Sequence, residues 1–401
     1  MSLDTLPLES APFLDVADPA FSLRGPEARA ARDKSWYART PYGIAVLRHA
    51  EMGKLLVHES LRQGSHAWPA HNGVTDGLFA EWWGSSILVT EGDDHWRLRK
   101  LVNPAFSPKI LRALMPEFER ISNELLDDFI DAGTCDFMKD FADPYASRIL
   151  CLLMGLPESA APTILDLSST MGIALGVNFK KHEAEIEAAT QALYDYVGSF
   201  IDDRRQNPGD DILSAMAAAT EDGDRLSEAE LMNLAVMLAF AGVDTTRNQL
   251  GLGISMFSEH PDQWEALAAD KSLDMAAAQE VMRMRPTITW VTREATEDFE
   301  FQGLDIAKGT TVHLYSESAG TDPSVFETAP FDIAAKRSRN YGFGGGIHHC
   351  LGHMVAKNDM AVAYRVLSAR IKAPRMLDGS TWLADSGNTG PISLPIEFEA
   401  R

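Results

Sequence analysis

The chain has 401 residues, of which 45% are apolar and 23% are charged, the balance of a folded globular protein and not of a disordered or membrane chain. Its formal charge is −22 because 58 acidic residues outnumber 36 basic ones, which argues against nucleic acid or an anionic membrane as a partner. The sequence contains no run of about eighteen apolar residues, so it predicts no membrane span. We therefore expect a cytoplasmic protein without a membrane anchor, in which Cys135 and Cys151 are buried free thiols.

The N-terminal part of the chain mixes helix and strand. Residues 26–35 have a helical pattern, and apolar and polar residues then alternate over 36–47 around Pro41-Tyr42-Gly43, which predicts a hairpin. Residues 62–86 are rich in Gly, His and Ser and include Trp82. For this tryptophan, packing in the core and contact with a bound molecule are both open.

Helices with apolar periodicity dominate the middle of the chain. One of them contains His95 and Arg99, which project from one face because they are four residues apart. By itself such a pair is typical of a solvated helix surface. Further helices are predicted over residues 110–132, 145–156, 160–175 and 181–205.

The longest predicted helix begins at a capping box, with Ser227 as N-cap and Glu230 three residues later. Its pattern continues to about Ser258, so the helix is roughly 45 Å long at about 1.5 Å per residue and should cross the molecule. Near its middle, residues 241–246 read Ala-Gly-Val-Asp-Thr-Thr, in which Gly, Asp and Thr lower the helix propensity. Such a weakness indicates either a functional site or a kink where another helix crosses closely.

Glu280 and Arg283 form a second pair at helical spacing. On an exposed helix this pair would contribute only about 0.3–0.5 kcal/mol. Its neighbours are mostly apolar, however, so we expect the pair to be buried and fully paired. Strands are predicted at 288–291 and within 299–312 and 382–398, and a helix is predicted from about 354 to 370.

The most informative stretch runs from Phe343 to Gly352 and reads Phe-Gly-Gly-Gly-Ile-His-His-Cys-Leu-Gly. Its glycines let the backbone turn tightly and approach a flat partner. Cys350 falls where the turn becomes a helix, and the positive end of that helix would stabilise a thiolate. An anionic sulfur beside cleared space suggests a metal ligand. Two alternatives stay open: an inert buried thiol, or a zinc site in which His349 and His353 join Cys350.

This stretch resembles the haem-binding loop of the cytochrome P450 family, the haem-thiolate monooxygenases. The matching residues are Phe343, Gly344, Gly346, His348, Cys350, Gly352 and Ala356. Val355 and Lys357 replace the usual Leu and Arg but keep the chemical type, whereas Gly320-Thr321 replaces a usual Asn-Arg and should alter local loop packing. The family motifs His-x-x-x-Arg, Ala-Gly-x-Asp-Thr and Glu-x-x-Arg precede the loop in the usual order, so the resemblance covers nearly the whole chain.

The fold implied by the resemblance is the cytochrome P450 fold, mainly α with a smaller β-rich part, in a single domain over residues 1–401. Haem would lie between the long central helix and the Cys350 loop. Residues 176–180 would form the tip between two helices that cover the substrate. The helix-rich core is expected over about 90–290 and 350–372, and the β-rich parts over about 36–60, 288–315 and 380–400.

The resemblance also implies roles for individual residues. Cys350 would be the axial ligand of the iron of haem b (iron protoporphyrin IX) and would promote O–O cleavage. Asp244 and Thr245 would be catalytic and deliver the protons that this cleavage needs. Glu280, Arg283 and Arg337 would form a structural network beneath the haem. The residues implied to hold haem are His95, Trp96, Arg99, Ala241, Arg293, Phe343, His348 and Cys350. The residues implied to contact substrate are Trp82, Ile87, Val236, Ile288 and Ile392.

The activity implied is insertion of one atom of O2 into an apolar small molecule, by hydroxylation or epoxidation. A monomer would receive electrons from an external ferredoxin and its NAD(P)H-dependent reductase, docked on the Cys350 side. Two alternatives stay open: a peroxide-driven peroxygenase of the same fold, which usually lacks the acid and alcohol pair, and a haem-binding sensor without catalytic activity. The basic patch expected to receive the ferredoxin comprises Lys100, Lys109, Arg337, Arg339 and His353.

Overall fold

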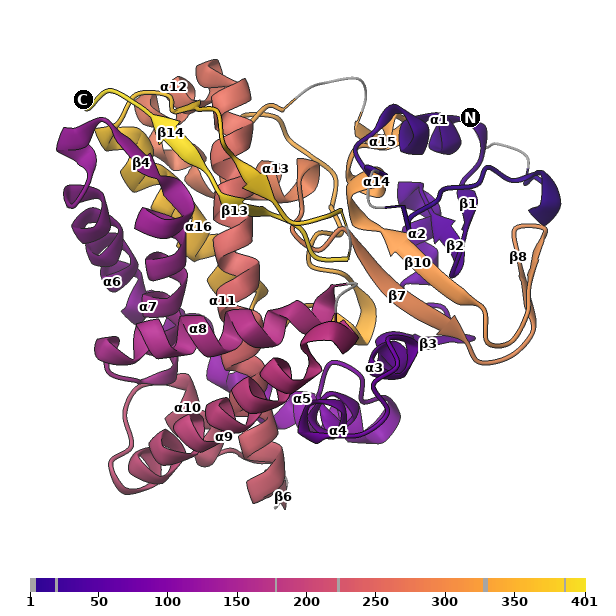
Figure 1. The fold of residues 1–401 in the computed structure, drawn as a ribbon, viewed down its shortest axis with the longest axis horizontal. Coiled ribbons are helices and arrows are strands. Elements are labelled where there is room, and N and C mark those ends of the chain that lie inside the picture. The colour runs from indigo at the N-terminus through magenta and orange to yellow at the C-terminus, as the bar shows by residue number, and fades with distance from the viewer. Residues whose placement is uncertain (1–4, 19–20, 177–178, 222–223, 327–330, 386) are drawn as a thin grey trace.

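The computed structural model describes residues 5–18, 21–176, 179–221, 224–326, 331–385 and 387–401. Helices fill one side of the molecule, and a smaller part that contains the largest sheet lies beside them (Figure 1). The N-terminal segment belongs to the sheet part, whereas the C-terminal strands lie over the helices. Residues 5–18 and the C-terminal strands therefore lie on different parts of the molecule.

The largest sheet has five strands in the order β1-β2-β10-β7-β3. These strands are β1 (Tyr37–Thr40), β2 (Gly43–Val46), β3 (Leu61–Gln63), β7 (Trp290–Ala295) and β10 (Thr311–Tyr315). β1 and β2 form the predicted hairpin, with Thr40 opposite Gly43. β10 runs parallel to β2 and antiparallel to β7, so it joins the N-terminal hairpin to strands from late in the chain. The predicted strand at 288–291 starts too early, because Ile288 forms only an isolated bridge with Asn388.

The remaining strands are short. A three-stranded sheet has the order β11-β14-β4, and three further pairs join β5 with β6, β8 with β9, and β12 with β13. Their bounds are β4 (Thr134–Asp136), β5 (Thr220–Glu221), β6 (Asp224–Arg225), β8 (Phe299–Phe301), β9 (Leu304–Ile306), β11 (Arg375–Met376), β12 (Thr381–Trp382), β13 (Pro391–Ser393) and β14 (Pro395–Glu397).

The helices form the larger core. Buried apolar side chains of α6, α7, α8, α9, α11, α13 and α16 belong to one continuous cluster, and a smaller cluster lies against the five-stranded sheet. No helix in the described ranges is both long enough and apolar enough to span a membrane. The helices are α1 (Pro26–Lys34), α2 (His49–Leu55), α3 (Trp68–His71), α4 (Leu78–Ser85), α5 (Gly92–Val102), α6 (Pro108–Asp127), α7 (Asp143–Met154), α8 (Ala161–Gly172), α9 (Glu183–Gln206), α10 (Ile212–Ala217), α11 (Glu228–Glu259), α12 (Pro261–Ala269), α13 (Asp274–Met284), α14 (Ser316–Gly320), α15 (Pro323–Phe326) and α16 (His353–Arg370).

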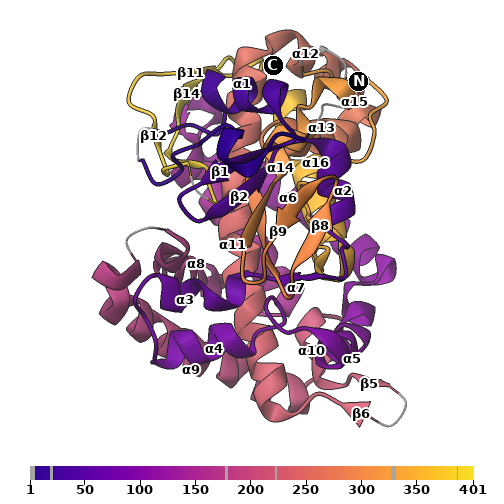
Figure 2. The ribbon, with the colours of Figure 1, turned by 90° about the vertical axis from the view of Figure 1, so that its right-hand side faces the viewer.

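Helix α11 is the long helix that the sequence predicts, and it crosses the helical part from end to end (Figures 1 and 2). Its 32 residues span roughly 48 Å. Both halves of the capping box form: Ser227 Oγ accepts from the Glu230 N–H at 3.3 Å, and Glu230 Oε2 accepts from the Ser227 N–H at 2.8 Å. The backbone stays helical through residues 241–246, so the weak propensity there does not interrupt it.

Candidate active site

The Cys350 loop is a tight structure that two glycines make possible. Gly344 and Gly346 have φ values of +66° and +69°, in the left-handed region that side-chain-bearing residues rarely adopt. A Cβ on Gly346 would also lie 2.8 Å from the Leu56 carbonyl oxygen. The Cys350 N–H donates to the Phe343 carbonyl at 3.1 Å and closes the loop. The turn thus presents the cysteine just before α16.

The Cys350 side chain is half-buried, and burial raises the pKa of its thiol. The Gly352 N–H, Arg99 and Lys357 each lower this pKa, but only in part. The sequence predicts that the start of a helix stabilises a thiolate here. Helix α16 begins at His353, and the N–H of its N-cap Gly352 is one of the groups that lower this pKa. A bound metal ion is what would hold the sulfur as an anion, since it deprotonates a coordinating thiol outright.

The alternative zinc site is wrong for this structure. The His349 and His353 rings lie 4.5 Å apart, but His353 Nδ1 contacts the Cys350 carbonyl oxygen at 2.9 Å and not the sulfur. Across the described ranges, no three side chains of His, Cys, Asp or Glu are arranged to hold a metal ion. Cys151 is buried and Cys135 half-buried, and burial raises the pKa of each, as expected of unreactive thiols.

Cationic side chains gather beside the loop. Arg99 donates from Nη2 to the His349 carbonyl at 3.0 Å, and His95 Nε2 contacts the Ile347 carbonyl oxygen at 3.1 Å. The His95 and His348 rings are 4.3 Å apart. Arg293, on β7, is only 4% exposed. Burial lowers the pKa values of Arg99 and Arg293, and the nearby Cys350 sulfur and Glu91 carboxylate, respectively, offset this only in part.

This cluster fits the carboxylates of haem. Among the described residues neither Arg99 nor Arg293 has a carboxylate within ion-pair distance, although a buried guanidinium needs one. His95 is 1% exposed, and its Nδ1 has no hydrogen-bond partner within the described ranges. Glu91 contacts His348 Nε2 at 3.0 Å, and the sequence analysis overlooked this acid. Trp96 differs from the others because it is 61% exposed and does not join the buried cluster.

The middle of α11 opens on one side. Ala241 is exposed and Thr245 half-buried, although Val243 and Asp244 between them are buried. Thr245 Oγ1 donates to the Ala241 carbonyl at 2.7 Å, a back-bond within the helix. A small residue and a hydroxyl on an accessible face leave room for a flat molecule, and this is the second feature that fits haem.

Asp244 lies in a buried network that sequence reasoning only partly found. Its Oδ1 accepts from Arg247 Nε at 3.0 Å, and Arg247 Nη1 donates to Asp143 at 3.1 Å. Asn388 Nδ2 donates to Asp244 Oδ2 at 2.6 Å. Burial alone would lower the pKa of Arg247, but the charges of Asp244 and Asp143 raise it above its usual value. The i, i+3 spacing could have indicated Arg247, whereas nothing in the sequence indicates Asn388.

The structure brings Glu280, Arg283 and Arg337 together. Arg283 binds Glu280 in a bidentate pair at 2.6 and 2.8 Å, and Arg337 Nη2 donates to the same carboxylate at 3.0 Å. Glu280 and Arg283 are buried, as the apolar surroundings predict. Arg283 also donates to the Gly320 carbonyl at 2.6 Å, so the pair ties α13 to α14.

The residues predicted to contact substrate differ in their exposure. Trp82 is 1% exposed and packs edge-on against Phe240, and Val236 is also fully buried, so both belong to the core. Ile87 and Ile288 are half-buried, and Ile392 is 52% exposed.

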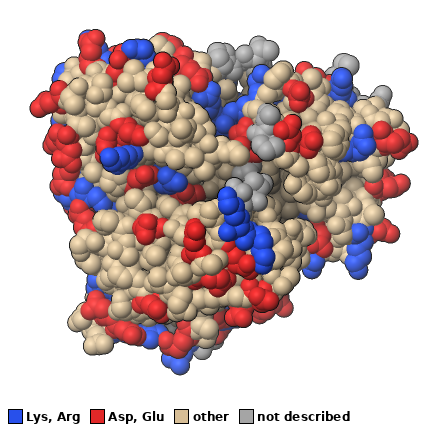
Figure 3. All heavy atoms as spheres, viewed as in Figure 1, with Lys and Arg blue, Asp and Glu red and all other residues tan. Residues whose placement is uncertain are grey.

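The face shown in Figure 3 is hollowed between the helical part and the sheet part, and acidic side chains are scattered over its surface in patches. The segments on either side of residues 177 and 178 each contact an aromatic residue from α3 or α4. Trp68 Nε1 donates to the Ala174 carbonyl at 2.7 Å, and the Phe79 and Phe179 rings lie 5.1 Å apart. The tip predicted at 176–180 lies partly outside the described residues, because 177 and 178 are not among them.

Comparison with known proteins shows which family this chain resembles. The family model described as Cytochrome P450 matches residues 43–367. Luteothin monooxygenase from Streptomyces thioluteus is 36% identical over 394 residues, which cover 97% of this chain and 96% of that protein. The polyketide biosynthesis cytochrome P450 PksS from Bacillus subtilis is 32% identical over 320 residues, or 78% of this chain and 77% of that protein.

A solved structure gives the same result for the fold. Cytochrome P450 CYP109Q5 from Chondromyces apiculatus superposes with a TM-score of 0.86 at 26% identity, covering 98% of this chain and 99% of that one. The predicted fold, mainly helical with smaller sheets, is thereby confirmed. The chain therefore belongs to the cytochrome P450 family and is a haem-thiolate oxidoreductase of the monooxygenase type.

Proposed function

We propose that this enzyme inserts one atom of O2 into an apolar small molecule, with haem b bound through Cys350 and electrons from an external ferredoxin. The observation that carries the proposal is the middle of α11, where accessible Thr245 follows buried, ion-paired Asp244. An alcohol and an acid in sequence can pass protons inward from the surface. When bound, haem supplies the chemistry that activates O2.

The side chains of the site have separate tasks in this proposal. Cys350 binds the iron through its sulfur, and His95, Arg99 and Arg293 bind and orient the carboxylates by charge-assisted hydrogen bonds. Thr245 holds a proton at Oγ1, where the hydroxyl can accept one hydrogen bond while it donates another. Its acidic neighbour Asp244 relays the replacement proton from bulk solvent.

Three predicted contact residues and the names of two relatives support a substrate class. Half-buried Ile87 and Ile288 and exposed Ile392 offer apolar surface, and none of them carries a charge that would select a polar ligand. One relative is named for luteothin and another for polyketide biosynthesis. We therefore propose an apolar molecule of polyketide type as the substrate, oxidised by hydroxylation or epoxidation.

The electron donor would dock on the side of the Cys350 loop. Lys100, Lys109 and Arg339 of the predicted basic patch are exposed, which supports contact with an acidic ferredoxin. Two of the five residues of the predicted patch are half-buried. Arg337 is mostly buried against Glu280, and the His353 ring contacts the Cys350 carbonyl, so neither belongs to the exposed surface.

A screen of apolar compounds tests the proposal. Polyketides, steroids, terpenoids and fatty acids are added to the ferric enzyme, and compounds that shift haem from low to high spin are turned over with a surrogate ferredoxin, its reductase, NAD(P)H and isotopically labelled O2. We expect a product with one labelled oxygen. Turnover by peroxide alone would support the peroxygenase instead, and spin shifts without any product would support a sensor.

A further inference from the structure

Asp244 is held from two sides by residues that lie far apart in the chain. Arg247 binds Oδ1 through Nε and Nη2, each at 3.0 Å. Asn388 donates to Oδ2 at 2.6 Å, and Asn248 donates to the same oxygen at 3.4 Å. Because Asp244 is buried, these partners and not water set the direction of its carboxylate.

The Asn388 amide is itself oriented by a second set of bonds. Thr287 Oγ1 lies 3.0 Å from Asn388 Oδ1 and 2.7 Å from the Thr389 carbonyl oxygen. The Thr287 N–H donates to Gln249 Oε1 on α11 at 2.9 Å. With its oxygen facing a hydroxyl, the amide turns its NH2 group to Asp244. Asn388 therefore joins α11, the segment before β7 and the loop between β12 and β13.

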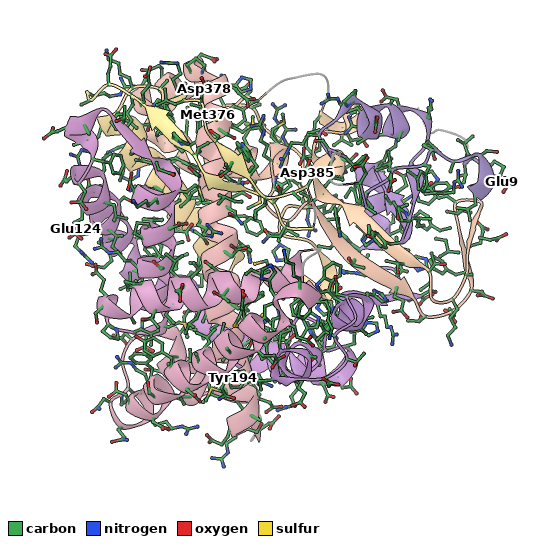
Figure 4. All side chains as sticks on the ribbon, in the orientation of Figure 1. Glu9, Glu124, Tyr194, Met376, Asp378 and Asp385 are labelled. Carbon is green, nitrogen blue, oxygen red and sulfur yellow. The ribbon has the colours of Figure 1, made fainter. Side chains whose placement is uncertain are left out.

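That loop is packed directly on α11. A Cβ on Gly390 would lie 2.6 Å from Asn248 Cβ, and a Cβ on Gly251 would lie 2.4 Å from Pro391 Cγ. Only glycine permits both approaches. Asp385, labelled in Figure 4, belongs to the same loop and lies where the helical part meets the sheet part; it accepts a hydrogen bond from the Ser22 hydroxyl at 2.8 Å. The loop is thus held in place on both sides of Asn388, at Asp385 and at Gly390.

We propose that Asn388 is a positioning residue for Asp244, which fixes Oδ2 so that the carboxylate stays paired with Arg247 beside Thr245. Through this bond, proton supply depends on the loop that leads to exposed Ile392, and thus on the substrate's surroundings. The inference rests on the proton-relay role proposed above for Asp244. Of the contacts that described residues make with Oδ2, a shorter side chain at 388 would leave the long one to Asn248.

The test compares four enzymes: wild type, Asn388→Ala, Asp244→Asn and the double variant. Thr389→Val is the matched control, because Thr389 is in the same loop and is also buried, but its hydroxyl faces Asp385 and not Asp244. Each protein is loaded with haem and driven by the surrogate ferredoxin system, with the first compound from the spin-shift screen and without it. The readouts are product and peroxide formed per NAD(P)H, the ratio of NAD(P)H oxidation rates in H2O and D2O, the spin shift and the haem content.

We expect Asn388→Ala to lower the product formed per NAD(P)H by about tenfold and to change the solvent isotope ratio, since it perturbs a proton donor. The spin shift and the haem content should stay as in wild type, and Thr389→Val should match wild type throughout. The double variant should be no worse than Asp244→Asn alone, because both changes act on one step. Wild-type coupling in Asn388→Ala, or an equal loss in the Asp244→Asn background, would overturn the inference.

Two further outcomes separate this inference from the proposed function. If Asp244→Asn itself leaves coupling and isotope ratio unchanged, the relay role fails; if only the Asn388 variants behave like wild type, the relay role stands and the positioning role fails. Asn388→Asp provides a second variant of equal size, should the alanine variant not fold. It places two carboxylates together, so its coupling should be low at neutral pH and recover as pH falls and one of them is protonated.

Discussion

Cys350 is a thiol whose surroundings favour the neutral form. Burial raises its pKa, and the nearby cations Arg99 and Lys357 offset this only in part. In the proposed enzyme the iron and the sulfur therefore depend on each other, because iron holds the thiolate and the thiolate binds the iron. At the scale of one residue, the loop supplies geometry while the bound metal supplies the charge state.

Replacing this sulfur should change the spectrum before it changes the fold. Cys350→Ser keeps the size of the side chain but not the soft anionic ligand, so the ferrous carbon monoxide complex should lose its thiolate-type absorption. Cys151→Ser is the control, because Cys151 is a buried free cysteine of α7 and should leave that absorption unchanged. Survival of the thiolate-type spectrum in Cys350→Ser would show that another residue is the ligand.

Thr245 gives a second prediction at this scale. Thr245→Ala removes the hydroxyl but not the helix, so NAD(P)H should still be oxidised while peroxide appears in place of product. We expect about a hundredfold less product per NAD(P)H, the scale of a lost proton donor. Thr246→Val, a change at the buried neighbouring threonine, should have a smaller effect. Equal coupling in Thr245→Ala and wild type would contradict the role.

At the scale of elements, an arginine from α1 binds the loop after α14, where the arginine usual in the family is absent. A Cβ on Gly320 would lie 2.3 Å from the Arg283 carbonyl oxygen, so the usual asparagine would not fit there. The usual arginine is absent at Thr321, and Arg32 of α1 reaches in instead. It donates to the Ser318 carbonyl at 2.6 Å and to Thr321 Oγ1 at 2.8 Å. A guanidinium thus still binds this loop, but it comes from α1.

The capping box of α11 can be tested by stability. Ser227→Ala removes the acceptor of the Glu230 N–H and should lower the free energy of unfolding by about 1 kcal/mol. Urea denaturation of the haem-loaded protein measures it. The control is Ser199→Ala, at an exposed position inside α9, where a change near zero is expected. An equal effect at both positions would mean that the cap contributes nothing specific.

At the scale of the whole molecule, two buried groups of the sheet part give stability opposite dependences on pH. Burial lowers the pKa of His313 to about 4, so between pH 4 and the ordinary value of 6.5 the unfolded chain takes up a proton that the folded chain does not. Burial raises the pKa of Glu317 to about 7, so the folded chain keeps a proton there. The contribution of His313 to the free energy of unfolding falls as pH falls, whereas the contribution of Glu317 falls as pH rises.

The His313 contribution can be isolated by substitution. His313→Gln keeps a polar group near Thr292, which lies 3.2 Å from the ring, but removes the titration. Relative to this variant, wild type should lose up to about 3 kcal/mol of unfolding free energy as pH falls from 6.5 to 4. Urea titrations at several pH values measure the difference. Thr292→Val should keep the wild-type slope, and parallel curves for wild type and His313→Gln would refute the assignment.

The sequence alone determined what lies within one helix or one turn. The capping box at Ser227, the pair Glu280 and Arg283, and the glycine turn before Cys350 are local, because helical spacing and turn geometry decide which of their groups meet. Only the tertiary structure decided which distant groups meet: Asn388 on Asp244, Arg32 at Thr321, and β10 between β2 and β7. Such contacts depend on how whole elements pack, and no local spacing encodes that.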